Sequence, residues 1–308
     1  MPSNSFVGRY VGRVFRPGVL TLLFLALTQP SFAQSAPASA QPAVESWRDR
    51  TDLFIGLDGS KQPQDLGINA NMGPRFAVNL GAPVVRGAGL GVQFGAALNL
   101  SDAAVHVLDQ VDGTSRRTQV FTTLGVFQRA GRISWGVGYD ALRQYYFDDK
   151  WMGQWRGEIT TALGVNDQVG VWFTVPARRA DAAVGETALR LAPIGQVNGM
   201  FRHQWPSGAR TGLWVGLAEG HHNVVLVFPD NTRDEHVLVY GAEVSMPLNE
   251  RWSITGATNL MTPTATGTVD AFMGVTFNFG KGRTRPVAFA PVLGVANNTA
   301  FSVDLSRQ

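Results

Sequence analysis

The segment from Val92 to Leu100 alternates apolar residues with small or polar residues without interruption. A period of two places the two sets on opposite faces of an extended strand. The same pattern recurs along the chain at near-even spacing, which is typical of β-structure. It predicts twelve strands, near residues 51–58, 74–81, 89–101, 118–128, 133–143, 154–163, 168–176, 194–204, 209–219, 236–246, 251–260 and 269–279.

The connections between these strands alternate strictly between short and long. The short ones are 82–88, 129–132, 164–167, 206–208 and 247–250, and the longer ones are 59–73, 102–117, 144–153, 177–193, 220–235 and 261–268. Bacterial outer-membrane barrels have short periplasmic turns and longer external loops. We therefore predict an all-β fold, a transmembrane antiparallel up-and-down β-barrel of about 12 strands over residues 51–279, with both of its ends in the periplasm.

The face that meets lipid has to be chosen, because a soluble barrel also alternates and turns its apolar side inward. Twelve strands enclose a lumen that one apolar residue in two would hardly fill, so we place the apolar face outside. A soluble all-β protein is the alternative. The predicted lipid-facing residues are Phe76, Val78, Leu80, Val92, Phe94, Leu98, Leu100, Trp135, Val137, Tyr139, Trp155, Ile159, Leu213, Val215, Leu217, Leu238, Tyr240, Val244, Val275 and Phe277.

The polar residues at the opposite positions are then predicted to line the lumen. They are Arg75, Gln93, Asn99, Asp140, Arg156, Glu158, Glu243 and Asp270. Charges inside a barrel either brace its wall or form a constriction that selects solutes. We favour bracing, because no feature of the sequence defines an open path. For the strand at 118–128 the pattern does not choose between Phe121, Thr123 and Phe127 on one face and Val120, Leu124 and Val126 on the other.

Residues 1–33 have the features of a secretory signal peptide: three arginines, no acidic residue and an apolar run of residues 19–27. We place the cleavage site after Ala33, with Ala36 or Ala40 as alternatives. Residues 34–50 are predicted to be a flexible periplasmic linker, or else a recognition peptide for a periplasmic partner. The expected location is the outer membrane, and the expected partners are outer-membrane lipid and the barrel-assembly machinery.

The chain has 26 basic and 23 acidic side chains, and removing the signal peptide takes away three arginines and leaves 23 of each. A mature chain without excess positive charge gives no reason to expect nucleic-acid binding. Cysteine is absent, which excludes disulfides, thiol catalysis and thiolate metal sites. After residue 33 no apolar run reaches the roughly 18 residues of a helical membrane span. We expect no cofactor.

Two groups of residues are candidates for metal binding or catalysis. His221 and His222 follow Glu219, and His106 lies near Asp102, but a metal site needs three or four converging ligands, so we interpret these as solvated loop histidines. A lipase or acyltransferase would need a serine, a histidine base and an orienting group. Ser60, Ser101 and His221 are available, yet no spacing links them and no Gly-x-Ser-x-Gly elbow is present. We predict no catalytic and no metal-binding residue.

Residues 280–308 form a C-terminal tail that is unusually apolar for a periplasmic end. It begins with a basic turn and continues with Phe289, Leu293, Phe301 and Val303, which should not remain in water. Our hypothesis is that the tail folds back into the barrel mouth or along its wall as a plug. A rival interpretation makes residues 299–305 the closing strand, but another spanning strand would place the C-terminus outside.

Three segments carry a family resemblance: Gly-Leu-Asp-Gly-Ser-Lys-Gln-Pro-Gln-Asp at 56–65, Gly-Gln-Trp-Arg-Gly at 153–157 and Ala-Pro-Val-Leu-Gly-Val-Ala-Asn-Asn-Thr at 290–299. They resemble an uncharacterised family of predicted outer-membrane barrel proteins from planctomycete bacteria, from about Leu53 to the C-terminus. The resemblance implies the same location and a tail that belongs to the barrel unit. It implies no catalytic residue, because that family has no assigned activity.

These observations favour a non-enzymatic, porin-like protein. The leading hypothesis is a passive pore for small hydrophilic solutes. The alternative is a non-conducting structural or loop-presenting envelope protein, and a lipid-modifying enzyme is third.

Overall fold

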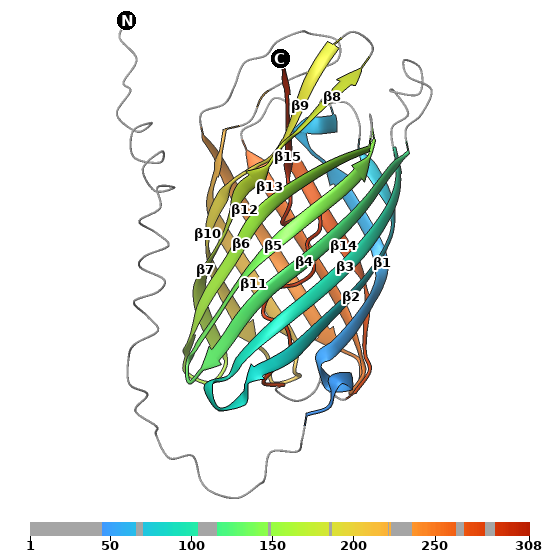
Figure 1. The fold of residues 1–308 in the computed structure, drawn as a ribbon. Helices are drawn as coiled ribbons and strands as arrows, with labels where there is room; N and C mark the ends of the chain where they lie inside the picture. The colour runs from blue at the N-terminus through green and yellow to red at the C-terminus, as the bar shows by residue number, and fades with distance from the viewer. Residues whose placement is uncertain are drawn as a thin grey trace, which may run out of the picture. The chain divides into compact units, whose positions relative to one another are not determined.

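The computed structural model describes residues 45–65, 70–103, 116–146, 149–184, 187–220, 222, 236–262, 268–280 and 287–308. Within these residues, twelve antiparallel strands close into a barrel (Figure 1), which confirms the predicted fold. In wall order they are β1 (Thr51–Lys61), β2 (Asn71–Val85), β3 (Leu90–Ala103), β4 (Arg117–Ala130), β5 (Ile133–Tyr145), β6 (Asp149–Leu163), β7 (Asp167–Arg178), β10 (Gln196–Gln204), β11 (Arg210–Glu219), β12 (His236–Pro247), β13 (Trp252–Thr262) and β14 (Thr268–Asn278). Pairing of β1 with β14 closes the wall.

The short connections turn tightly at one end of the barrel, which we call the short-turn end. Gly89, Gly131, Gly164 and Gly208 have positive φ angles and lie in or beside four of these turns. Glycine adopts this backbone conformation without a steric penalty, so it suits a tight reversal between strands. In the fifth turn the Asn249 side chain accepts hydrogen bonds from the backbone N–H groups of residues 251 and 252, both at 2.9 Å. We call the opposite end, which carries the longer connections, the long-loop end.

Apolar side chains point outward from the wall over most of its surface. The side chains of Leu213, Val215 and Met273 are 62%, 58% and 63% exposed. An exposed apolar surface of this extent suits lipid and would be a liability in water. On β4, Leu124 and Val126 are exposed while Phe121 and Phe127 are fully buried inside, so the structure settles the strand that the sequence left open. No helix in the described ranges is long and apolar enough to span a membrane.

Three further strands form a separate sheet beyond the long-loop end of the wall. They are β8 (Ala180–Val184), β9 (Thr187–Pro193) and β15 (Val303–Arg307), in the order β15–β9–β8 (Figure 1). The hairpin of β8 and β9 lies within the long connection expected at residues 177–193. The C-terminal strand pairs with β9 and with no barrel strand, so it is not the closing strand of the wall.

Short 3-10 helices lie at both ends of the barrel: η2 (Trp47–Arg50), η3 (Pro63–Asp65) and η4 (Arg86–Ala88). The Asp49 carboxylate accepts a hydrogen bond from the Ser46 backbone N–H at 3.0 Å, which fixes the start of η2. The prediction of a flexible linker through Arg50 therefore extends too far, because residues 46–50 are ordered by local hydrogen bonds.

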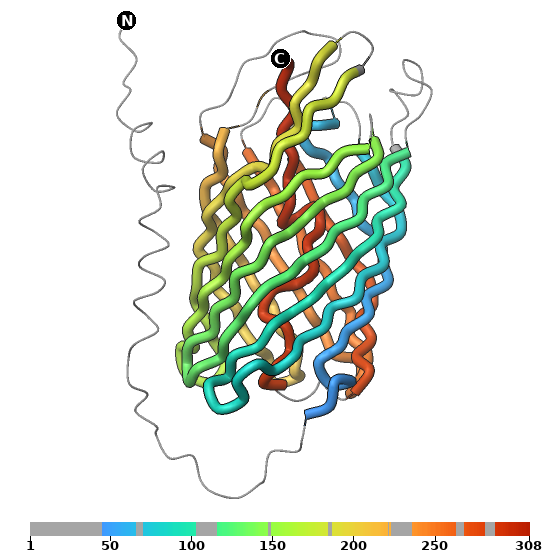
Figure 2. The backbone as a smooth tube through the Cα atoms, in the orientation of Figure 1, coloured from blue at the N-terminus to red at the C-terminus, as the bar shows by residue number. Residues whose placement is uncertain are grey.

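The tail passes lengthwise through the barrel (Figure 2). At the short-turn end the carbonyl of Phe289 lies so close to Gly81 that a Cβ there would be 2.0 Å from it. Further along, Val295 lies against Gly95, where a Cβ would be 2.6 Å from the valine side chain. These glycines leave room for the tail to run against the wall. The C-terminus thus reaches the long-loop end through the lumen, a route that counting turns does not reveal.

Candidate functional site

The lumen is the candidate site, because the wall directs its polar side chains into it and the tail passes among them. At the short-turn end the Arg129 guanidinium of β4 donates to the carbonyls of Ala288 and Ala290, the first at 3.0 Å. The Glu45 carboxylate accepts the backbone N–H groups of Ala288 and Phe289, at 2.5 and 3.3 Å. The first part of the tail is therefore held in place by two elements, the segment before η2 and strand β4.

In the middle of the lumen a glutamine side chain binds the tail backbone as a neighbouring strand would. The Gln93 amide donates to the Leu293 carbonyl at 2.9 Å and accepts the Leu293 N–H at 3.1 Å. Asn79 donates to the same carbonyl at 3.1 Å. Backbone groups buried away from water need such partners, and here the wall side chains supply them.

A second contact of the middle region joins three wall strands to the tail. The Arg156 guanidinium donates to Asp140 at 2.8 Å and to the Gly294 carbonyl at 2.6 Å. Thr123 donates to Asp140 at 2.7 Å and accepts the N–H of Ala296 at 3.0 Å. The buried Asp140 carboxylate is thereby paired with a cation and a hydroxyl, as a charge in this position must be.

Arg75 also binds the tail from inside the wall. Its guanidinium donates to the Asn99 side chain at 2.9 Å and to the Ala296 carbonyl at 3.0 Å. It lies over the rings of Phe121 and Phe272, at 5.8 and 5.9 Å from their centroids. A guanidinium gains from such stacking in surroundings of low polarity. Arg75 is 2% exposed, so its charge is almost fully enclosed by these contacts.

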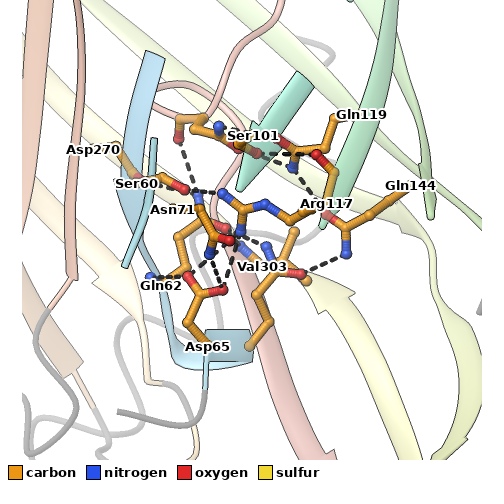
Figure 3. Close-up of polar contacts among 12 residues, drawn as sticks. Ser60, Gln62, Asp65, Asn71, Ser101, Arg117, Gln119, Gln144, Asp270 and Val303 are labelled. Carbon is orange, nitrogen blue, oxygen red and sulfur yellow. Dashed lines mark hydrogen bonds and ion pairs between the residues drawn. The ribbon is translucent and has the colours of Figure 1, made fainter. Parts of the chain in front are cut away.

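Towards the long-loop end, four buried glutamines connect the wall to the tail (Figure 3). Asn298 of the tail exchanges hydrogen bonds with Gln119, both at 3.1 Å. The chain of amides continues to Gln144 at 2.8 Å, to Gln64 at 2.7 Å and to Gln62 at 2.8 Å. Gln62 then accepts the N–H of the first residue of β15 at 3.1 Å, which returns the chain to the tail. A glutamine amide both donates and accepts, so each side chain can bond to the next, and hydrogen bonds linked in this way strengthen one another.

Beside this chain an ion pair secures the loop that carries η3 (Figure 3). Arg117 lies 3.1 Å from Asp65, and both side chains are fully buried. Burial raises the pKa of the Asp65 carboxyl, and the Arg117 charge acts in the opposite direction. Arg117 also donates to the Ser60 hydroxyl, and Ser101 donates to the Arg117 carbonyl at 3.1 Å. The two serines considered for catalysis are therefore buried in a structural network, while His221 lies outside the described residues.

A separate charged cluster braces the wall away from the tail. Arg202 of β10 donates to Glu243 of β12 at 2.5 Å and to Glu158 of β6 at 3.1 Å. β12 and β6 are each next-but-one neighbours of β10 in the wall, so one arginine connects three strands within a run of five. Arg202 was missed by the sequence analysis. It shares the inward parity of Gln196 and Asn198, which was the available signal.

The predicted lumen residues thus fall into two groups. Those that contact the tail or a residue bonded to it are Arg75, Gln93, Asn99, Asp140, Arg156 and Asp270; Glu158 and Glu243 belong to the Arg202 cluster. Gln62, Gln64 and Gln144 were not predicted because they fall in the expected long connections 59–73 and 144–153, and Gln119 was not predicted because the pattern left its strand unoriented. The available signal was parity, because Gln144 continues the inward positions of Asp140 on β5, and the pairing of β4 with β5 places Gln119 opposite Gln144.

The histidine candidates do not form a metal centre in the part of the chain that is described. His222 Nδ1 lies 2.8 Å from the Asp304 carboxylate of the tail, and its backbone N–H donates to the same carboxylate at 2.8 Å. Among the described residues no three His, Cys, Asp or Glu side chains are placed to hold a metal ion. His106 lies outside the described residues.

Solved structures with a similar fold are outer-membrane β-barrels. An outer membrane channel from Pseudomonas putida F1 has a TM-score of 0.54 and 10% identity, covering 79% of this chain and 99% of that one. The toluene transporter TodX from Pseudomonas putida has a TM-score of 0.44 and 10% identity, covering 75% of this chain and 90% of that one. LpxR from Salmonella typhimurium has a TM-score of 0.41 and 9% identity, covering 73% of this chain and 99% of that one.

At 10% identity the channel from Pseudomonas putida F1 shows the fold alone, and that fold is an outer-membrane barrel. No curated protein sequence matches the chain. The planctomycete source implied by the resemblance stays a prediction. Residues 50–303 match a family of unknown function, DUF6666, and the chain therefore belongs to that family.

Proposed function

We propose that the protein is an outer-membrane channel whose own tail closes the lumen at rest, and that small hydrophilic solutes pass only when the tail is displaced. The outer-membrane barrel fold supports the location. The apolar outer surface supports it as well, because it matches a lipid environment. We further propose export with a cleaved signal peptide and insertion by the barrel-assembly machinery.

The observation that carries this proposal is the chemistry of the contact between wall and tail. Gln93, Arg75, Arg156 and Gln154 bind tail carbonyls with polar side chains, the last at 2.8 Å from Ala300. A lumen built to stay filled could use apolar packing throughout. Polar wall groups can instead exchange the tail for water at a net cost of about 0.5–1.5 kcal/mol for each hydrogen bond. The lumen would then remain a polar path after the tail leaves.

A non-conducting envelope protein is the second candidate, and a specific observation favours it. The tail contacts the wall along the whole lumen and then pairs with β9 through five residues, from Val303 to Arg307. Such a tail could serve as a permanent core that supports the sheet beyond the long-loop end. A lipid-modifying enzyme has less support, because Ser60 and Ser101 are buried and hydrogen-bonded to Arg117.

Conductance of the refolded protein in planar bilayers, with and without residues 288–308, tests the proposal. We expect the full-length protein to be mostly silent and the deletion to show a steady open conductance. Adding the deleted segment as a synthetic peptide should close the channel again. Correct folding of the deletion is checked by heat-modifiable electrophoretic mobility and by circular dichroism.

Two results would overturn the proposal in different ways. A correctly folded deletion without conductance would refute the channel and leave the envelope protein. A steady conductance of the full-length protein would show that the tail does not close the lumen.

A further inference from the structure

A polar cavity lies at the long-loop end, where the tail emerges beside β9. Its volume is about 210 Å³, and its charged and polar lining comprises Arg179, Arg190, Glu219, His222, Asp304 and Ser306. These residues come from four places: the β7–β8 junction, β9, the end of β11 with the residues after it, and β15. The cavity therefore exists only when the tail occupies its place beside β9.

Two charges of this cavity lack partners among the described residues. Arg190 is paired with Asp181 at 2.9 Å, and Asp304 is paired with His222 at 2.8 Å. Within those ranges, in contrast, the Arg179 guanidinium and the Glu219 carboxylate have no hydrogen-bonding or ion-pair partner. As far as the described residues show, one cation and one anion without partners thus line the same cavity.

We propose that this cavity binds a small zwitterion of the amino-acid type, with its carboxylate on Arg179 and its ammonium on Glu219. A guanidinium binds a carboxylate through two parallel hydrogen bonds, and a carboxylate is the natural partner of an ammonium group. The cavity is smaller than the roughly 300–1,000 Å³ of sites for drug-sized ligands, so a ligand with a small side chain fits best. The lining offers little apolar surface to hold an uncharged hydrocarbon.

Binding here would also act on the tail, since Asp304 and Ser306 belong to it. A ligand that binds only the form with the tail in place stabilises that form by its differential affinity. The ligand would therefore favour the closed barrel. This consequence rests on the proposed function, whereas the binding itself does not.

Isothermal titration calorimetry of the refolded full-length protein in detergent tests the binding. We expect glycine and L-alanine to bind, and acetate and ethylamine, which carry one charge each, to bind at least about tenfold more weakly. Arg179→Gln and Glu219→Gln should each weaken L-alanine binding by about tenfold or more. Arg178→Gln is the matched control, because Arg178 is exposed beside Arg179 and does not line the cavity.

Three results would overturn the inference. They are no binding of either amino acid to the unmodified protein, acetate binding as tightly as L-alanine, and variants that bind L-alanine unchanged. The comparison of ligands uses only the unmodified protein, so it remains decisive if a variant misfolds. Because calorimetry does not depend on conductance, a failure here is distinct from a failure of the channel proposal.

Discussion

Replacing Gln93 by leucine tests how strongly the wall holds the tail. The Gln93 side chain is 3% exposed and makes two hydrogen bonds to Leu293, at 2.9 Å to its carbonyl and 3.1 Å from its N–H. Leucine has a similar size and no polar atoms. The substitution therefore removes both hydrogen bonds while largely preserving the packing.

The expected loss of stability depends on which hydrogen bonds the backbone N–H and carbonyl of Leu293 keep in the variant. The Leu293 N–H loses its partner and remains buried, which costs about 1–3 kcal/mol. The Leu293 carbonyl keeps Asn79 at 3.1 Å, so its lost bond costs only about 0.5–1.5 kcal/mol. Together these destabilise the seated tail by about 2–4 kcal/mol, which raises the equilibrium constant for tail release by about 30- to 900-fold.

Thiol labelling measures this release without background, because the chain contains no cysteine. Ala296 is fully buried, and an Ala296→Cys variant should react with a maleimide only when the tail leaves the lumen. Adding Gln93→Leu should raise the labelling rate by the factor above. Gln168→Leu is the control, since Gln168 is exposed and should leave the rate unchanged. A Gln93→Leu rate within about threefold of its parent would refute the reasoning.

Three further predictions concern the tail, the wall and its outer surface. Phe301→Ala removes a fully buried ring and should destabilise the seated tail by about 3–5 kcal/mol. The Ala296→Cys variant should then react faster with the maleimide, and an unchanged rate would contradict the packing of Phe301 in the lumen. Arg202→Gln should lower the free energy of unfolding in urea by about 2–4 kcal/mol, because Glu158 and Glu243 lose their cation. Adding Glu158→Gln to this variant should recover part of the loss, and no recovery would argue against the cluster. Val215→Arg places a charge at the middle of the outer face and should cost about 2–4 kcal/mol of stability in lipid bilayers. Val165→Arg is the control and should cost little, because this side chain lies in a short turn and is 99% exposed. Equal effects of the two substitutions would mean that the outer face does not meet lipid.

The wall could be predicted from the sequence because its information is local. Alternation with a period of two marks each strand, and turn residues such as Gly131 and Gly164 mark the reversals. Antiparallel neighbours joined by short turns then pair in chain order, which leaves little freedom in the topology. The inward parity of Asp140 and Arg156 follows from the same period, and their pairing at 2.8 Å follows from being neighbours on β5 and β6.

The path of the tail could not be predicted in this way, because it has no local signal. An apolar segment with Phe289 and Phe301 must leave water, yet several places could receive it. The choice depends on Gly81 and Gly95, whose missing side chains leave room, and on Gln93, which offers its amide. These residues are about 200 positions distant in the chain from their contacts in the tail.

The strand at 118–128 shows the same limit within the wall. Its two faces are similarly apolar, so the pattern alone could not orient it. Phe121 faces inward because Phe301 of the tail packs on it with ring centroids 6.0 Å apart. The buried Gln119 faces inward on the same strand and binds Asn298. The tail makes the apolar Phe121 suitable for the lumen, because the two rings pack on each other there.

The sequence by itself therefore determined the barrel, its number of strands and the polarity of its two faces, since each depends on residues close together in the chain. The tertiary structure alone decided that the tail occupies the lumen, that β15 joins β9, and that neutral amides such as Gln62 and Gln119 bind it. The physical reason is that a wall strand is specified by its neighbours, whereas the filling of a lumen is specified by every strand around it at once.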